Sequence, residues 1–265
     1  MDYQEIEVEP ARDAIEHSIS RQSVGFVFGG TGRQMDTASG VALIWRKRRL
    51  IVTANHVFPA GAENEDFVVI LPRDRPLNRS DKVVLPPKDM ACVVSMPRVS
   101  LVRCDSDDLA YFEVDDKFGE SSDIDFYELP PFAVCPPAGT GCLLSGYPQD
   151  LSGPISSDEG LVNLANRWSK IESLGDKERF LKGFDGDSQF LMKFRKANKG
   201  ARAEGFSGGG VWFPLRQTPD SRVWHAVSGL AGIQSKWFQG SALTLAVRVE
   251  ILVRFLNHTI RDLQE

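Results

Sequence analysis

The chain has 265 residues, of which 42% are hydrophobic and 25% charged, with a formal net charge of −5. These values are typical of a globular protein that buries a substantial core in one domain or two small ones. The negative charge argues against a nucleic-acid partner, because nucleic-acid-binding proteins cluster basic side chains. No apolar run is long enough to span a membrane and no N-terminal signal segment is evident, so we expect a cytoplasmic protein without a membrane partner.

The predicted elements begin with a helix within residues 1–22, where Ile15 and Ile19 recur at helical spacing. From Ser23 onward, short apolar strands alternate with turn residues, a pattern that favours an antiparallel barrel. The basic run Arg46–Arg49 lies between two of these strands and favours a solvated hairpin tip over an anion-binding patch. The strands predicted for this first part are 24–28, 41–45, 50–53, 67–71, 91–95, 101–104 and 109–114.

The second part of the chain follows a linker that we predict within residues 115–137, which are acidic and then rich in proline. Between residues 147 and 189 the sequence is polar with apolar residues at intervals, which predicts a long surface excursion with a strand or a helix of its own. A closing amphipathic helix is predicted from Val249 onward. The strands predicted for this part are 141–145, 189–194, 210–215, 223–232 and 242–247.

A serine flanked by glycines stands in the stretch Gly205-Phe206-Ser207-Gly208-Gly209-Gly210. A serine hydroxyl is a poor nucleophile at neutral pH, so it needs a base within hydrogen-bond reach and a third group that orients the base. Of the four histidines, His56 ends a predicted strand, and Asp108 begins a later one, with Asp107 as the alternative. Glycines let backbone N–H groups approach a developing oxyanion, and Gly205 and Ser207 are the expected donors.

Three segments together resemble the motifs of the chymotrypsin/trypsin-like serine peptidases: Thr53-Ala54-Asn55-His56, Asp108-Leu109-Ala110 and Gly205-Phe206-Ser207-Gly208-Gly209. The resemblance extends from Ser23 to the C-terminal helix. It implies an all-β fold of two antiparallel six-stranded β-barrels with an N-terminal helical segment and a C-terminal helix. Residues 1–22 would then form an extension, 23–120 the barrel that carries the histidine and aspartate, and 121–265 the barrel that carries the serine.

The resemblance also implies an activity, the hydrolysis of peptide bonds in a protein or peptide substrate through an acyl-enzyme. His56 would act as base and then acid, Asp108 would orient it and Ser207 would attack the substrate, with neither metal nor organic cofactor. Counting back from Ser207 puts Ala201 near the base of the specificity pocket, with Ser235 and Trp237 in the pocket as well. Glu204, Asp185 and Asp187 are alternative acidic groups for the same pocket.

One departure from the family concerns control of the activity. Phe206 stands where digestive members have an aspartate that pairs with a newly cut N-terminus, so activation of the trypsinogen kind is not expected. We therefore expect a serine endopeptidase of narrow specificity, or one gated by a regulatory protein partner. Two other functions remain open: a protease-fold module that binds peptides without turnover, and an esterase acting on small acyl groups.

The cysteines are a second departure. Cys92, Cys104, Cys135 and Cys142 are not placed to form the disulfides that flank the histidine in secreted members of the family. Their spacing also lacks the paired short intervals of a metal site. We predict that the four thiols are reduced and that Cys92 and Cys104 are core residues of β-strands.

Overall fold

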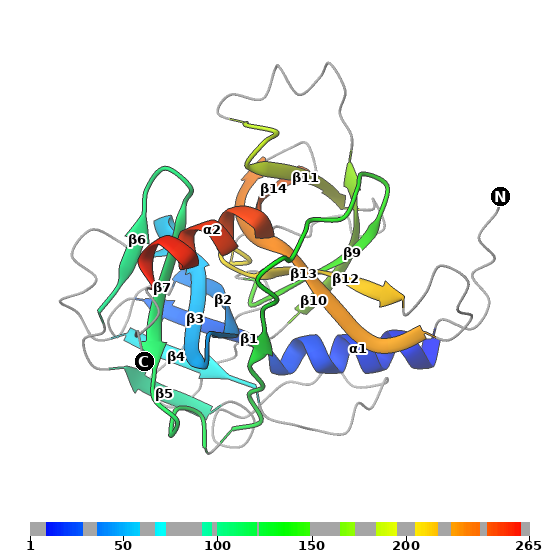
Figure 1. Cartoon of the computed structure of the whole chain (residues 1–265). Helices are drawn as coiled ribbons and strands as arrows, with labels where there is room; N and C mark the ends of the chain where they lie inside the picture. The colour runs from blue at the N-terminus through cyan, green and yellow to red at the C-terminus, as the bar shows by residue number, and fades with distance from the viewer. Residues whose placement is uncertain are drawn as a thin grey trace.

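The computed structural model of the protein describes residues 9–28, 36–58, 67–72, 92–96, 100–120, 122–148, 165–172, 184–194, 205–216, 224–238 and 243–260. Two sheets account for most of these residues (Figure 1). The first contains β1 (Ser23–Phe28), β2 (Asp36–Trp45), β3 (Arg48–Ala54), β4 (Phe67–Leu71), β5 (Cys92–Met96), β6 (Val102–Cys104), β7 (Leu109–Val114) and β8 (Tyr127–Glu128). The second contains β9 (Gly141–Gly146), β10 (Ala165–Glu172), β11 (Gln189–Phe194), β12 (Gly210–Arg216), β13 (Trp224–Phe238) and β14 (Leu243–Arg248).

The first sheet runs in the antiparallel order β5-β4-β1-β2-β3-β7-β6. It has eight strands rather than the expected six, partly because β8, which lies within the predicted linker, pairs in parallel with β2 at Leu43 and Ile44. The core of this sheet is a group of four phenylalanine rings in edge-to-face contact, with centroids 5.4 to 6.5 Å apart: Phe26, Phe58, Phe67 and Phe112. Such pairs add to the stabilisation from burying apolar surface.

The second sheet is a closed barrel of six strands in the order β10-β11-β14-β13-β12-β9, as the family resemblance implies. The segment predicted as an excursion contributes β10, which pairs with both β9 and β11 and so completes the barrel. Its strands are buried on both faces: Leu144, Val211, Trp212 and Ile233 are completely buried, and Trp212 packs edge to face against Tyr127 of the first sheet at 5.1 Å. The second of the two predicted barrels is therefore present, with the expected six strands.

Both predicted helices are present. Helix α1 (Glu9–Arg21) lies outside the sheets and buries Ile15 and Ile19 in the same apolar cluster as the second barrel. Helix α2 (Val249–Thr259) follows β14 directly and reaches the first sheet, where Phe255 packs edge to face against Tyr111 at 5.6 Å. No helix in the described ranges is long and apolar enough to cross a membrane.

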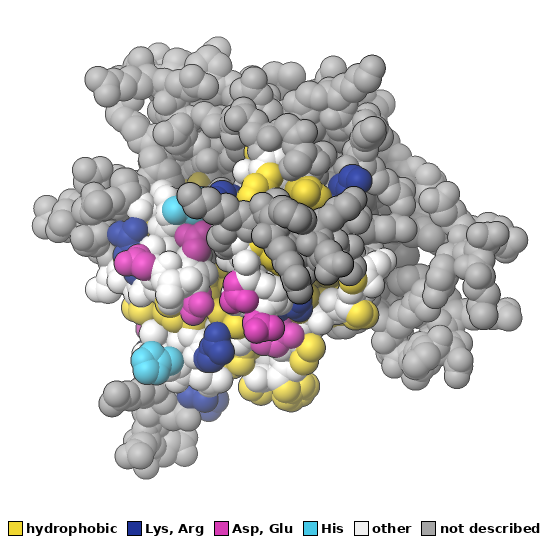
Figure 2. Space-filling view, turned by 90° about the horizontal axis from the view of Figure 1, so that it is seen from above, with side chains coloured by type: hydrophobic (Ala, Val, Ile, Leu, Met, Phe, Trp, Pro, Cys, Tyr) yellow, Lys and Arg dark blue, Asp and Glu magenta, His cyan; other side chains and the backbone are white. Residues whose placement is uncertain are grey.

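The basic run forms the tip of the hairpin between β2 and β3, as predicted. Arg46 and Lys47 occupy the turn with positive φ angles of 48° and 67°, the backbone that tight hairpin turns use. Arg46 also donates to the Asn257 side chain of α2 at 2.7 Å. Arg48 pairs with Glu113 on the neighbouring strand at 3.2 Å. Basic and acidic side chains are likewise interspersed among the described residues on the face seen in Figure 2.

Cys104, Cys135 and Cys142 are free thiols. Cys135 and Cys142 are buried, and burial raises the pKa of each to about 12. Cys104, predicted as a core residue, is only half-buried in β6 and packs at the edge of the core. Cys92 lies in β5, but its side chain falls outside the described part of the structure.

Candidate active site

His56 lies on a short 3-10 turn, η1 (Asn55–Val57), at the end of β3. Two hydrogen bonds hold the backbone that leads to it: Thr53 Oγ1 donates to the Ser39 carbonyl at 2.6 Å, and the Asn55 N–H donates to the Asp108 carbonyl at 3.1 Å. The side chain of His56 is 49% exposed. The backbone that leads to His56 is therefore held in place, and the imidazole ring remains accessible from outside.

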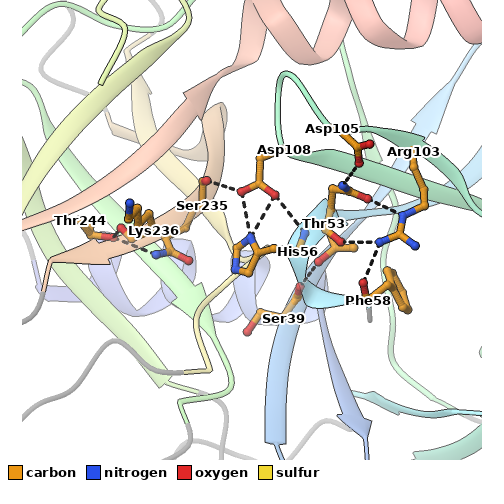
Figure 3. Close-up of polar contacts among 12 residues, drawn as sticks. Ser39, Thr53, His56, Phe58, Arg103, Asp105, Asp108, Ser235, Lys236 and Thr244 are labelled. Carbon is orange, nitrogen blue, oxygen red and sulfur yellow. Dashed lines mark hydrogen bonds and ion pairs between the residues drawn. The ribbon is translucent and has the colours of Figure 1, made fainter. Parts of the chain in front are cut away.

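Asp108 contacts His56 at three points (Figure 3). Its carboxylate oxygens lie 2.9 and 3.0 Å from His56 Nδ1, and one of them also accepts the His56 backbone N–H at 3.0 Å. The neighbouring carboxylate of Asp107 instead accepts the thiol of Cys104. The structure thus selects Asp108 over Asp107 as the partner of the imidazole.

Asp108 has an unusual backbone conformation, and the pKa of its carboxyl is lower than the ordinary value. Its φ angle is 52°, a left-handed conformation that aspartate tolerates better than most residues. Burial on its own would raise the pKa of the carboxyl, but hydrogen bonds from His56 and Ser235 outweigh this effect and hold the pKa below its ordinary value. Asp108 is therefore ionised at neutral pH.

Ser235 is the site residue whose role the sequence did not reveal. Its hydroxyl donates to Asp108 Oδ2, the same oxygen that lies 2.9 Å from His56 Nδ1 (Figure 3). The pairing of β13 with β14 shifts register between Gln234 and Lys236, so Ser235 sits at a β-bulge. Bulges re-aim side chains, and this one accompanies a buried serine that faces the carboxylate. We predicted Ser235 only as a pocket residue, because nothing in its local sequence indicates the bulge.

The turn that carries Ser207 depends on its glycines. Gly205 and Gly208 have φ angles of 91° and 86°, which favour glycine. A Cβ atom on Gly208 would overlap the Thr53 hydroxyl and the Ser39 carbonyl. The Ser207 carbonyl accepts the Ser39 N–H at 2.8 Å. The turn is therefore pressed directly against the strands that lead to His56.

The structure brings the Ser207 turn to the histidine side of the site without joining the two side chains. Among the described residues, the Ser207 hydroxyl makes no hydrogen bond to His56. The backbone N–H groups of Gly205 and Ser207 likewise have no acceptor in the described part of the chain. In enzymes without substrate, catalytic hydrogen bonds are often long and tighten only when the substrate binds.

Phe206 anchors this turn in the apolar core. The side chain is 1% exposed and belongs to the large apolar cluster that both sheets share. Its ring lies so close to β9 that a Cβ atom on Gly146 would sit 2.9 Å from it. Burial of this apolar ring stabilises the turn.

The predicted specificity pocket is only partly described. Ala201 and Glu204 lie outside the described residues. Trp237 is half-buried and packs against the large apolar cluster that both sheets share. Asp185 stabilises its own turn by accepting the Ser188 hydroxyl at 2.7 Å, and this bond, with one from the Asp187 backbone, lowers its pKa. The assignment of pocket residues stays a prediction.

The described residues contain no group of three histidine, cysteine, aspartate or glutamate side chains that could hold a metal ion. A carboxylate, an imidazole and a hydroxyl on three separate turns, together with two backbone N–H groups beside the hydroxyl, are the groups used in acyl transfer.

Comparison with known proteins supports the fold. No family model matches the sequence, and no curated protein matches it. Among solved structures, a serine endoprotease from Yersinia pestis is similar with a TM-score of 0.58 and 14% identity over 94% of this chain and 66% of that one. A protein called GrC is similar with a TM-score of 0.56 and 16% identity over 91% of this chain and 94% of its own.

The chain spans slightly less than two thirds of the Yersinia protein. At these identities the comparison speaks for architecture alone, and it agrees with the two antiparallel sheets described above. This protein has the fold of the chymotrypsin/trypsin-like serine peptidases.

Proposed function

We propose that the protein is a serine endopeptidase that cleaves peptide bonds through an acyl-enzyme formed on Ser207. The observation that carries this proposal is the triple contact of Asp108 with His56, on both the ring and the backbone. A structural histidine at a strand end needs no ionised carboxylate on Nδ1. A general base does need one, because the carboxylate fixes its tautomer and stabilises its protonated form.

The tautomer follows from the partners. An ionised carboxylate only accepts hydrogen bonds, so Nδ1 of His56 carries the proton that faces Asp108. Nε2 is then left with the lone pair that can take the proton of the Ser207 hydroxyl. Ser235 donates a further hydrogen bond to Asp108, which keeps the carboxylate ionised and oriented. The whole chain of contacts prepares His56 to act as a base.

In the proposed reaction, Ser207 Oγ bonds to the substrate carbonyl carbon while its proton passes to His56. The carbon–nitrogen bond then breaks and His56 returns the proton to the leaving amine. A water molecule, deprotonated by the same imidazole, then attacks the acyl carbon, the ester bond to Ser207 Oγ breaks, and His56 returns the proton to Ser207 Oγ. The backbone N–H groups of Gly205 and Ser207 would stabilise the oxyanion, and losing one such donor typically costs a factor of about 100 to 1,000 in turnover.

Control of this activity is proposed to come from narrow specificity or from a protein partner. The burial of Phe206 supports a Ser207 turn that is formed without a newly cut N-terminus. An enzyme that is active without N-terminal cleavage would need another restriction on the substrates that it cleaves. Broad digestion of unfolded casein by the purified chain, with no partner added, would contradict this part of the proposal.

The proposal can be tested with internally quenched peptides that vary at the cleaved position, together with matched small esters. We expect peptide cleavage by the wild-type chain, and a fall in kcat by a factor on the order of 10,000 or more in Ser207→Ala and His56→Ala. Ester hydrolysis without peptide cleavage would favour the esterase. Peptide binding without any product would favour the binding module, and either result would overturn the endopeptidase.

A further inference from the structure

Ser39, on β2 of the first sheet, uses every one of its polar groups in hydrogen bonds around the Ser207 turn. Its hydroxyl donates to the Gly205 carbonyl at 2.6 Å and accepts the Tyr147 N–H at 2.8 Å. Its own N–H donates to the Ser207 carbonyl at 2.8 Å. Its carbonyl accepts the Thr53 hydroxyl at 2.6 Å. The residue is completely buried, so none of these bonds competes with water.

These contacts hold the backbone on both sides of the proposed nucleophile. The bond to the Gly205 carbonyl fixes the peptide plane between residues 205 and 206, and the bond to the Ser207 carbonyl fixes the plane between 207 and 208. The plane between them carries the Ser207 N–H, and its carbonyl, on Phe206, accepts the Gly209 N–H at 2.7 Å. Three successive peptide planes are therefore each held by a hydrogen bond.

The peptide plane between Gly205 and Phe206 is the one that depends most on a hydrogen bond from outside the turn. Glycine rotates freely about its backbone, and a φ angle of 91° is one of several that it adopts at low cost. Turning the Gly205 carbonyl away would break its bond with Ser39 and leave a buried acceptor without a partner, which costs free energy. The Ser39 hydroxyl thus favours the one orientation of this peptide that the structure shows.

We infer that Ser39 is a positioning residue for the oxyanion donor N–H of Ser207, acting through the backbone of residues 205–207. This inference rests on the proposed function, since it assigns a role within the same site. Ser39 touches neither His56 nor Asp108 through a hydrogen bond in the described residues. Its loss should therefore slow the acylation step while leaving the base unchanged.

The test is the reaction of the full chain with a fluorophosphonate, followed as kinact and KI for wild type, Ser39→Ala and Ser145→Ala. Ser145 is a matched control because it is also completely buried, and its hydroxyl pairs with that of Ser23 at 2.7 Å rather than with the catalytic turn. Displacing catalytic groups by about 1 Å can cost a factor of 100. We expect kinact to fall about 10-fold to 100-fold in Ser39→Ala.

Three further readouts separate positioning from general structural damage. In Ser39→Ala we expect an unchanged KI, an unchanged midpoint of the rate against pH, and one adduct per chain at the end of the reaction. Ser145→Ala should stay within about threefold of wild type in kinact, because the hydroxyl that it removes bonds Ser23 and, among the described residues, shares no hydrogen bond with the turn. Equal kinact in the two variants would overturn the inference, as would a lower final adduct count at a normal rate.

Ser39→Cys provides a second variant in case Ser39→Ala does not fold. A thiol is a weak donor, so kinact should lie between the values for wild type and alanine. A wild-type rate in Ser39→Cys, with Ser39→Ala unfolded, would contradict the inference. If the folded wild-type chain does not react at all, the proposed function fails first and the role of Ser39 fails with it. Reaction of wild type with no effect at Ser39 leaves the proposed function standing.

Discussion

At the scale of single residues, Asp108 adopts a disfavoured backbone conformation and makes several hydrogen bonds. Its left-handed φ angle is disfavoured for most side chains, and its partial burial opposes ionisation. The bonds from His56 and Ser235 offset the second cost and keep the pKa below its ordinary value. Disfavoured backbone conformations of this kind cluster at functional sites, where the surroundings hold them in place.

A dependence of stability on pH follows from this pKa. Since the pKa of Asp108 is lower in the folded chain than in the unfolded one, the carboxylate stabilises the fold above the unfolded-state pKa of about 3.9. That contribution is lost as the pH falls through the folded-state value. Asp108→Asn keeps a residue that tolerates the same φ angle but cannot ionise.

We therefore expect the free energy of unfolding of wild type to exceed that of Asp108→Asn near pH 6, and the difference to shrink below about pH 4. Urea unfolding of both proteins across pH 3 to 7 measures it. A difference that stays constant over this range would show that the charge of Asp108 adds nothing to the folded state.

At the scale of elements, strand β6 is tied to the turn that carries His56. Arg103 on β6 donates to the Asn55 side chain at 2.6 Å and to the Phe58 carbonyl at 2.7 Å. The other end of the Asn55 amide donates to Asp105 at 2.6 Å. The hairpin of β6 and β7 thus holds both ends of η1, and the same hairpin supplies Asp108.

Removing this link should destabilise the fold. We expect Arg103→Met to lower the free energy of unfolding by about 1 to 3 kcal/mol, because the acceptors on η1 lose a charged donor. Arg103→Lys should restore only part of this, since an ammonium cannot reproduce the planar fork of the guanidinium.

Arg48→Met is the matched control, because the pair of Arg48 with Glu113 lies at the surface and should contribute no more than about 0.5 kcal/mol. Urea unfolding of the three variants gives the comparison. Equal losses in Arg103→Met and Arg48→Met would mean that the link to η1 does not stabilise the turn.

At the scale of the whole molecule, the candidate site is divided between the two sheets. The first carries His56 and Asp108, and the second carries Ser235 and leads from the turn of Ser207. Contacts of Ser39 with Tyr147 and of Phe255 with Tyr111 join the two halves. The geometry of the site therefore depends on packing between residues that are distant in the sequence.

This division explains which parts could be predicted. Strands β7 and β11 lie at the predicted residues, because apolar runs and turn residues mark them locally. Strand β8 was not predicted, since its two residues pair only through tertiary contact with β2. The motif residues could be found from the sequence, but the role of Ser235 could not, because a bulge in the pairing of β13 and β14 creates it.

The most direct test of the account is covalent labelling of the folded chain by a fluorophosphonate, read as intact mass. The account predicts one adduct on the wild-type chain and none on Ser207→Ala. In His56→Ala the labelling rate should fall by a factor on the order of 10,000, because the hydroxyl loses its base. A folded wild-type chain that stays unlabelled, or a Ser207→Ala chain that labels as well as wild type, would contradict the claim that Ser207 is an activated nucleophile.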